Sequence, residues 1–147
     1  MAKREMELSP RLRLLADWVR PGASVADVGT DHAYLPVWLT VHGRVSSAIA
    51  SDLRQGPRQR AAEHCRLYGA ETVDCRLAPG LEAVSPEEAD TVIIAGMGGE
   101  NIAAILAAAP WTRDGAHTLL LQPMSRDAAL RRFLAENGYT ILREALT

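Results

Sequence analysis

The chain has 147 residues, of which 48% are hydrophobic and 23% are charged, and its formal net charge is -2. This length suits one domain with its own core, and the composition excludes disordered and fibrous classes. Cys65 and Cys75 have no C-x-x-C partner, so we expect neither a zinc site nor a disulfide scaffold. No membrane-length apolar segment or signal-peptide core occurs, which favours a cytoplasmic location with reduced thiols.

The basic residues are almost all arginine, since Lys3 is the only lysine among the 16 Lys and Arg residues. Guanidinium groups bind phosphate oxygens in a bidentate manner, which suits a nucleic-acid partner. A codon bias toward high GC content would produce the same composition. The net charge does not by itself indicate nucleic-acid binding.

Strand and helix signals alternate along the chain. Ser9 followed by Pro10 predicts the N-cap and first residue of a helix that ends before Pro21. Short apolar runs predict six strands, over residues 24–28, 45–51, 72–77, 91–95, 118–122 and 139–145. Between them we expect helices over residues 34–42, 56–68, 101–109 and 125–137, with Ser125 as the N-cap of the last one.

This alternation requires a doubly wound α/β fold with a mostly parallel sheet and right-handed crossovers. Ligands of such sheets bind outside the carboxyl ends of the strands, where the strand order reverses. The acids and glycines of this chain fall at those strand ends, so we expect residues 1–147 to form one ligand-binding domain.

The turn after the first strand reads Asp27-Val28-Gly29-Thr30-Asp31. A dinucleotide-binding turn needs G-x-G-x-x-G for close approach of the pyrophosphate, whereas Asp31 would repel phosphate. A carboxylate there attracts an ammonium or sulfonium group, and S-adenosylmethionine (SAM) carries both. The turn therefore favours SAM over the alternative of an NAD-dependent oxidoreductase.

Two further features lie at strand ends. Asp52 ends the second strand, where a carboxylate can accept both ribose hydroxyls of a nucleoside. The fourth strand ends in the run Ala95 to Gly99, which has few side chains, so the backbone can approach a flat ligand. The alternatives are that Asp27 and Asp52 only cap helices and that the glycines form an ordinary turn.

Five runs together resemble the TrmK family of SAM-dependent tRNA (adenine-N1) methyltransferases, which act on adenine 22. They are LSPRL (8–12), ADVGTDHAYLP (26–36), GP (56–57), IAGMGG (94–99) and LQP (121–123), in that order. The combination of DVGTDHAYLP with AGMGG is a specific signal. The resemblance covers nearly the whole chain and implies a Rossmann-like class I methyltransferase fold.

The resemblance also implies roles for individual residues. The cofactor-binding residues would be Asp27, Gly29, Asp31, Tyr34, Asp52, Leu53, Pro79 and Ala95. Gly96, Met97 and Gly98 would face the methyl acceptor, and His32 is either a base or a capping residue. The tRNA-binding residues would be Arg11, Arg13, Arg54 and Arg58, and no metal is expected.

Two departures from the family matter. This chain has Ala78-Pro79-Gly80-Leu81 where the family usually has an acidic GDGL-like turn, and its relatives continue into a seventh strand and a helical coiled-coil domain. We therefore expect six strands without the seventh, an open gap beside the fifth, and poor packing of Ile141 and Leu142. A SAM- or tRNA-binding remnant without activity is the alternative.

Overall fold

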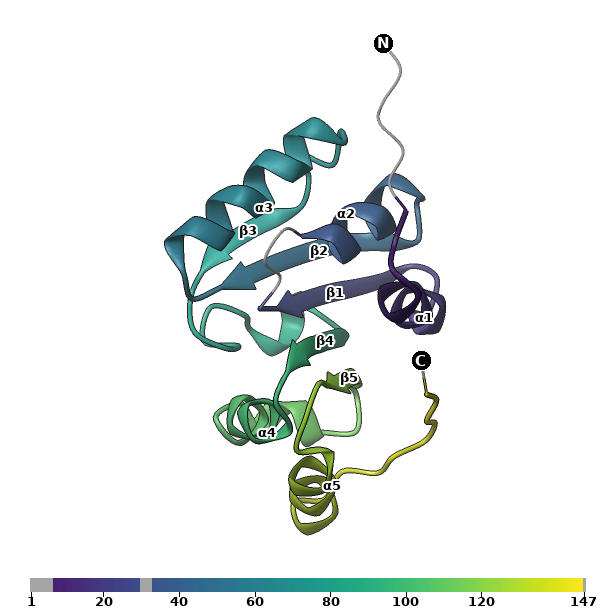
Figure 1. Ribbon diagram of the computed structural model, residues 1–147, viewed down its shortest axis with the longest axis vertical. Helices are drawn as coiled ribbons and strands as arrows, with labels where there is room; N and C mark the ends of the chain where they lie inside the picture. The colour runs from purple at the N-terminus through teal and green to yellow at the C-terminus, as the bar shows by residue number, and fades with distance from the viewer. Residues whose placement is uncertain (1–6, 30–32, 147) are drawn as a thin grey trace.

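The computed structural model describes residues 7–29 and 33–146. Its five strands form one sheet with the order β3-β2-β1-β4-β5, and every neighbouring pair is parallel. Figure 1 shows the strands following one another in this order from the α3 side of the molecule to the α5 side. The expected doubly wound α/β sheet is confirmed. The strands are β1 (Ala23–Val28), β2 (Val45–Asp52), β3 (Asp74–Leu77), β4 (Thr91–Met97) and β5 (Thr118–Pro123).

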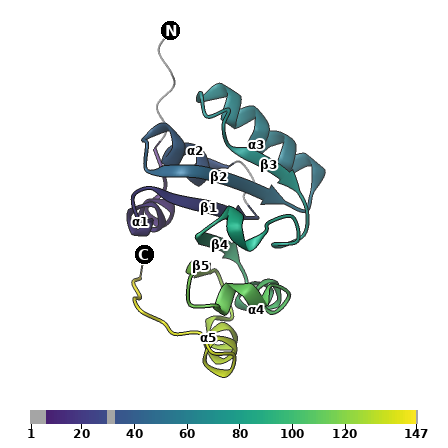
Figure 2. The ribbon, with the colours of Figure 1, turned by 180° about the vertical axis from the view of Figure 1, so that it is seen from behind.

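Helices cover both faces of this sheet (Figures 1 and 2). Successive residues of β4 point to opposite faces, so Val92 and Ile94 pack with α4 and α5, while Ile93 packs with α1 and α2. All three side chains are fully buried, as expected for a central parallel strand. The helices are α1 (Pro10–Trp18), α2 (Tyr34–Val41), α3 (Gln55–Leu67), α4 (Gly99–Ala107) and α5 (Asp127–Glu136), with short 3-10 helices η1 (Pro86–Glu88) and η2 (Pro110–Arg113).

A local signal sets the start of α1 but not the start of α5. Ser9 Oγ accepts a hydrogen bond from Leu12 N at 3.4 Å, so the predicted cap of α1 is confirmed. The predicted cap of α5 is wrong, because the N-cap is Arg126 in a left-handed conformation (φ 57°). Ser125 stays outside the helix, where its carbonyl accepts a 2.7 Å hydrogen bond from Gly99 N. A tertiary contact thus moved the helix start by one residue.

The predicted sixth strand over residues 139–145 is also wrong. Within residues 33–146 this segment makes no ladder with β5, so β5 is an edge strand. Side-chain contacts hold the segment instead: Arg143 lies over the Trp18 ring at 4.2 Å and Glu144 pairs with Arg131. Figure 1 shows it running from α5 toward α1. Without a sixth strand there is no gap within the sheet, but the outer side of β5 is unpaired within the described residues, and Ile141 and Leu142 are exposed, as expected.

None of the helices in the described ranges combines the length and the hydropathy needed to cross a membrane.

Candidate active site

The strand order reverses between β1 and β4, whose carboxyl ends therefore flank a crevice typical of ligand sites. Val28 lies beside Ile94 in the ladder, so the residues that follow these two also meet. Gly29 adopts φ +69°, and a Cβ placed on it would lie 2.8 Å from Met97 Cε. The side chain of Met97 thus lies against the glycine of the first turn, and two predicted site segments come together.

Two acids are buried at the carboxyl ends of neighbouring strands. Asp27, near the end of β1, is 7% exposed, and Asp52, at the end of β2, is 3% exposed. Asp52 Oδ1 accepts hydrogen bonds from Arg54 N at 3.0 Å and Arg54 Nε at 3.2 Å. A buried carboxylate is costly unless such partners hold it. The next residue, Leu53, is exposed and presents an apolar side chain at the same edge.

The carboxyl end of β4 contains a bulge, and a side chain of β5 supplies a hydrogen bond there. The register of β4 against β5 shifts between Ala95 and Met97, and Gly96 has φ +78°. Gly96 N donates to Gln122 Oε1 at 3.1 Å, so the side chain of Gln122 replaces the ladder partner lost at the bulge. The same oxygen accepts from Arg11 Nη1 at 3.0 Å. One side chain of β5 therefore joins the glycine loop to α1.

Gln122 is a residue that the motif-based assignment missed. The run LQP was recognised, but no role followed for its central residue. One feature of the sequence could have indicated a role for Gln122: it is a polar residue at the carboxyl end of an apolar strand. In the structure this position pairs with Ala95. Its contact with Gly96 depends on the bulge, which the sequence pattern did not predict.

Arg11 and Tyr34 line the same cavity of about 250 Å³, between the start of α1 and the start of α2. Arg13 lies elsewhere on α1: it pairs with Asp17 at 3.0 Å and covers the Trp38 ring at 4.8 Å. The two arginines that were predicted to act together thus have separate surroundings. Arg11 contacts Gln122 beside the glycine loop, whereas Arg13 lies on the outer surface.

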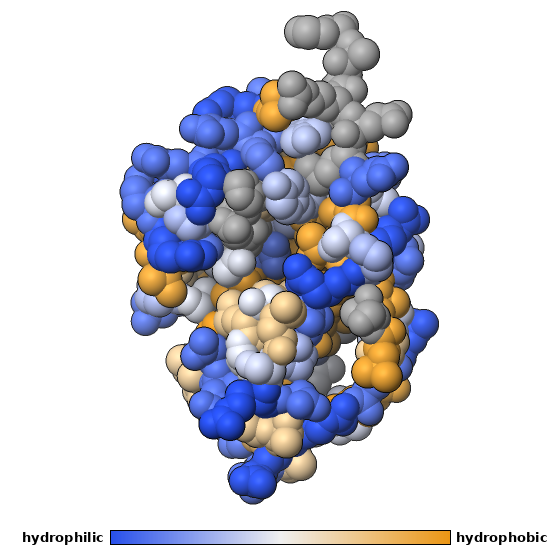
Figure 3. Space-filling model, in the orientation of Figure 1, coloured by the Kyte–Doolittle hydropathy of each residue, from blue (hydrophilic) through white to orange (hydrophobic). Residues whose placement is uncertain are grey.

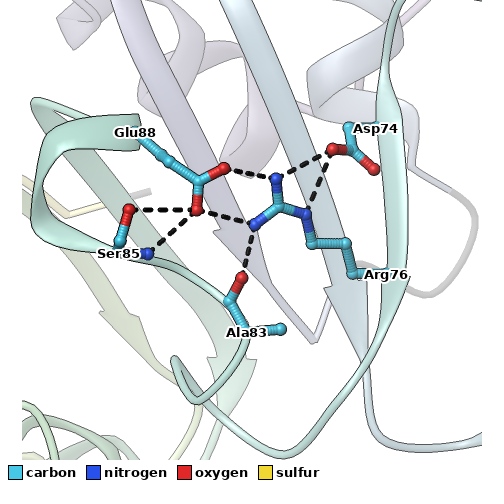
Figure 4. A network of polar contacts seen from close by, with 5 residues as sticks. All are labelled: Asp74, Arg76, Ala83, Ser85 and Glu88. Atoms are coloured by element: carbon cyan, nitrogen blue, oxygen red, sulfur yellow. Dashed lines mark hydrogen bonds and ion pairs between the residues drawn. The ribbon is translucent and has the colours of Figure 1, made fainter.

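The loop after β3 is held by an arginine network (Figure 4). Arg76 of β3 donates to Asp74 Oδ2 at 2.8 Å, to Glu88 Oε1 at 2.9 Å and to the carbonyl of Ala83. Hydrogen bonds from Arg76 and from the Ser85 backbone lower the pKa of Glu88 to about 2. These contacts draw residues 83–88 onto β3 and fix the loop that contains Pro79.

Pro79 itself is exposed and lines a cavity of about 390 Å³ together with α4 and η2. The loop also joins β2, since Ala78 N donates to the Asp52 carbonyl at 3.0 Å and Ser51 Oγ to the Gly80 carbonyl at 3.4 Å. The loop after β3 therefore lies beside the buried Asp52.

Four further predicted site residues are Arg54, Arg58, Asp31 and His32. Arg54 and Arg58 lie at the start of α3, where Figure 3 shows a mostly hydrophilic surface. Asp31 and His32 lie outside the described residues. Within residues 7–29 and 33–146, no cluster of three or more His, Cys, Asp or Glu side chains is arranged to hold a metal ion.

A family model described as a methyltransferase domain matches residues 8–147 of the chain. The tRNA (adenine(22)-N(1))-methyltransferase of Bacillus subtilis is 36% identical over 143 residues, which is 97% of this chain and 60% of that protein. The crystal structure of the B. subtilis m1A22 tRNA methyltransferase TrmK superposes with a TM-score of 0.87, again at 36% identity, over 95% of this chain and 60% of that one.

Two ligand complexes are also similar. A Streptococcus pneumoniae protein crystallised with S-adenosyl-L-methionine is 40% identical, with a TM-score of 0.87 over 95% of this chain and 66% of that one. TrmK of M. capricolum in complex with S-adenosyl-homocysteine is 35% identical, with a TM-score of 0.65 over 69% of this chain and 47% of that one. The chain thus spans less than two thirds of the length of these relatives.

Proposed function

The chain belongs to the methyltransferase domain family, and we propose that it transfers a methyl group from SAM to N1 of adenine 22 in bacterial tRNA. One observation carries the proposal: Gly29 of the first turn and Met97 of the glycine loop meet where the strand order reverses. A cofactor held by the turn after β1 would then lie beside a target adenine held by the glycine loop at the end of β4. The relatives that bind SAM or its product support the choice of cofactor.

The residues present fit SAM. In our proposal the carboxylate of Asp52 accepts the ribose hydroxyls, and Leu53, Pro79 and Ala95 contact the flat adenine. Asp27, Gly29, Asp31 and Tyr34 would surround the methionine end, where carboxylates attract its ammonium group. When bound, SAM supplies a methyl group that its sulfonium makes electrophilic.

The chain itself has a positioning task. Adenine N1 has a free lone pair, so it needs no deprotonation before attack, and in-line alignment accounts for most of the catalysis. We assign the holding of the base to Gly96, Met97 and Gly98. The carbonyls of Ala95 or Gly96 would accept the N6 hydrogens, and water or His32 would remove the proton afterwards.

The partner in this proposal is tRNA, and the enzyme acts in the cytoplasm. Arg11, Arg54 and Arg58 flank the carboxyl edge of the sheet, and Arg13 extends the basic surface along α1. Guanidinium groups there would neutralise backbone phosphates while the base enters the site.

Two measurements on the purified chain test the proposal. Calorimetric titration with SAM should show stoichiometric binding, and incubation with unmodified tRNA and labelled SAM should yield 1-methyladenosine at position 22. A tRNA with guanine at position 22 is the control. Binding of SAM without methyl transfer would favour the inactive remnant, and failure to bind SAM would refute the proposed function.

A further inference from the structure

Two thiols meet between α3 and β3. Cys65 of α3 and Cys75 of β3 are the only cysteines in the sequence, and their Sγ atoms lie 3.8 Å apart. Cys65 is buried, at 3% exposure, whereas Cys75 is partly exposed. Both are free thiols in this structure. The pair takes no part in the proposed methyl transfer.

The surroundings of the two thiols shift their pKa values in opposite directions. A hydrogen bond from Cys65, together with the positive charges of Arg58 and Arg66, lowers the pKa of Cys75 to about 7 despite its burial and the nearby Asp74. The same hydrogen bond and burial raise the pKa of Cys65. Cys75 is therefore the accessible thiol that ionises first, and thiolates are the reactive form of cysteine.

We propose that Cys65 and Cys75 form a peroxide-reactive dithiol site, in which Cys75 attacks the oxidant and Cys65 resolves the product into an intramolecular disulfide. Cys75 Sγ displaces hydroxide from hydrogen peroxide, so an S–O bond forms, the O–O bond breaks, and the hydroxide takes up the thiol proton as water. Cys65 Sγ then attacks the sulfenic sulfur, so the S–S bond forms, the S–O bond breaks, and the departing hydroxide takes up the Cys65 proton as a second water. Overall, two thiols are oxidised and one peroxide is reduced to two waters.

Formation of this bond requires the sulfur atoms to approach from 3.8 Å to about 2.05 Å. The strand that carries Cys75, β3, lies at the edge of the sheet and pairs with β2 alone. The disulfide would tie α3, which begins just after Asp52, to the strand that leads into Pro79. Oxidation would thus link covalently two elements beside the proposed nucleoside site.

The test uses the reduced chain, hydrogen peroxide and dimedone, which traps sulfenic acids. The wild-type chain should lose two hydrogens in intact mass, yield one peptide pair joined through Cys65 and Cys75, and carry no dimedone. Cys65→Ser should retain the sulfenic acid and carry dimedone at Cys75. In Cys75→Ser, Cys65 should stay unmodified at the same peroxide concentration.

Circular dichroism establishes that each variant is folded. If Cys65→Ser does not fold, the wild-type disulfide and the unmodified Cys65 of Cys75→Ser decide the result. A stable dimedone adduct on the wild-type chain, disulfide-linked dimers alone, or no reaction of Cys75 would overturn the proposal. None of these readouts requires methyl transfer, so the result is independent of the proposed function.

Discussion

The side chain of Gln122 accepts a hydrogen bond from the backbone N–H of Gly96 at 3.1 Å and so anchors the glycine loop at the end of β4. We predict that Gln122→Leu lowers kcat for methyl transfer by about ten- to a hundredfold, the range expected for a misplaced acceptor. SAM affinity should fall less than kcat, because Ala95 is the one residue of β4 assigned to SAM and the other assigned contacts lie at β1, β2, α2 and the loop after β3.

Gln122→Glu is the matched control, since it keeps an oxygen acceptor for Gly96 N and for Arg11. Its kcat should stay within a few-fold of wild type. Equal losses in the Leu and Glu variants, or a parallel loss of SAM affinity, would contradict a positioning role.

Asp52→Ala should weaken SAM binding about ten- to a hundredfold, because a charge-assisted contact to the ribose hydroxyls contributes about 1.5–3 kcal/mol. Arg54→Ala is the control, since it removes the exposed side chain that pairs with Asp52 but leaves the carboxylate in place. Calorimetry should show an affinity near that of wild type for the Arg54 variant. An unchanged affinity for Asp52→Ala would remove the ribose assignment.

Adjacent glycines at the start of α4 should respond differently to alanine. A Cβ on Gly99 would lie 2.2 Å from the carbonyl oxygen of Arg126, so Gly99→Ala forces α4 and α5 apart and should cost about 1–3 kcal/mol or more of unfolding free energy. A Cβ on Gly98 meets only Ser125 Oγ at 3.4 Å. Denaturant unfolding should find Gly98→Ala close to wild type. Similar costs for both variants would show that backbone entropy, not the clash, sets the effect.

His117 should make stability depend on pH. Burial disfavours its charge, but hydrogen bonds to Asp114 and to the Pro86 carbonyl outweigh this and raise its pKa above the ordinary 6.5. The folded state therefore holds the proton more tightly, and the stabilisation is complete below pH 6.5 and lost as pH rises through the folded pKa. The denaturant concentration at the unfolding midpoint of the wild type should fall as the pH rises from 6.5 through the folded-state pKa. The midpoint of His117→Gln should not fall over the same pH range. Parallel pH profiles would disprove this account.

Binding to tRNA should weaken steeply with salt, because phosphate contacts release counterions. Arg11→Ala combined with Arg13→Ala should reduce the slope of log K against log salt by about two, if each arginine contacts one phosphate. The single variants Arg11→Ala and Arg13→Ala measure how much each arginine contributes to the slope. A slope unchanged by the double substitution would place the tRNA surface elsewhere.

Much of the site followed from local patterns. The β-branched run at Thr91 to Ala95 indicated a strand buried on both faces, and the acids and glycines at strand ends indicated the edge where a ligand binds. These inferences succeed because parallel strands of one sheet end at one edge, so residues far apart in sequence are placed together by topology alone.

The sequence by itself determined the five parallel strands, the covering helices and the family to which the chain belongs, because hydrophobic periodicity and turn residues act over a few positions. Only the tertiary structure decided that residues 139–145 form no strand, that Arg126 and not Ser125 caps α5, and that Gln122 holds Gly96. Each of these depends on a partner distant in sequence: a neighbouring strand for the ladder, the N–H of Gly99 for the carbonyl of Ser125, and a bulge in β4 that frees one backbone donor. A backbone or side-chain group forms a hydrogen bond with the partner that the fold places within reach. Local sequence preferences act over a few residues, so they do not specify which distant residue that partner is.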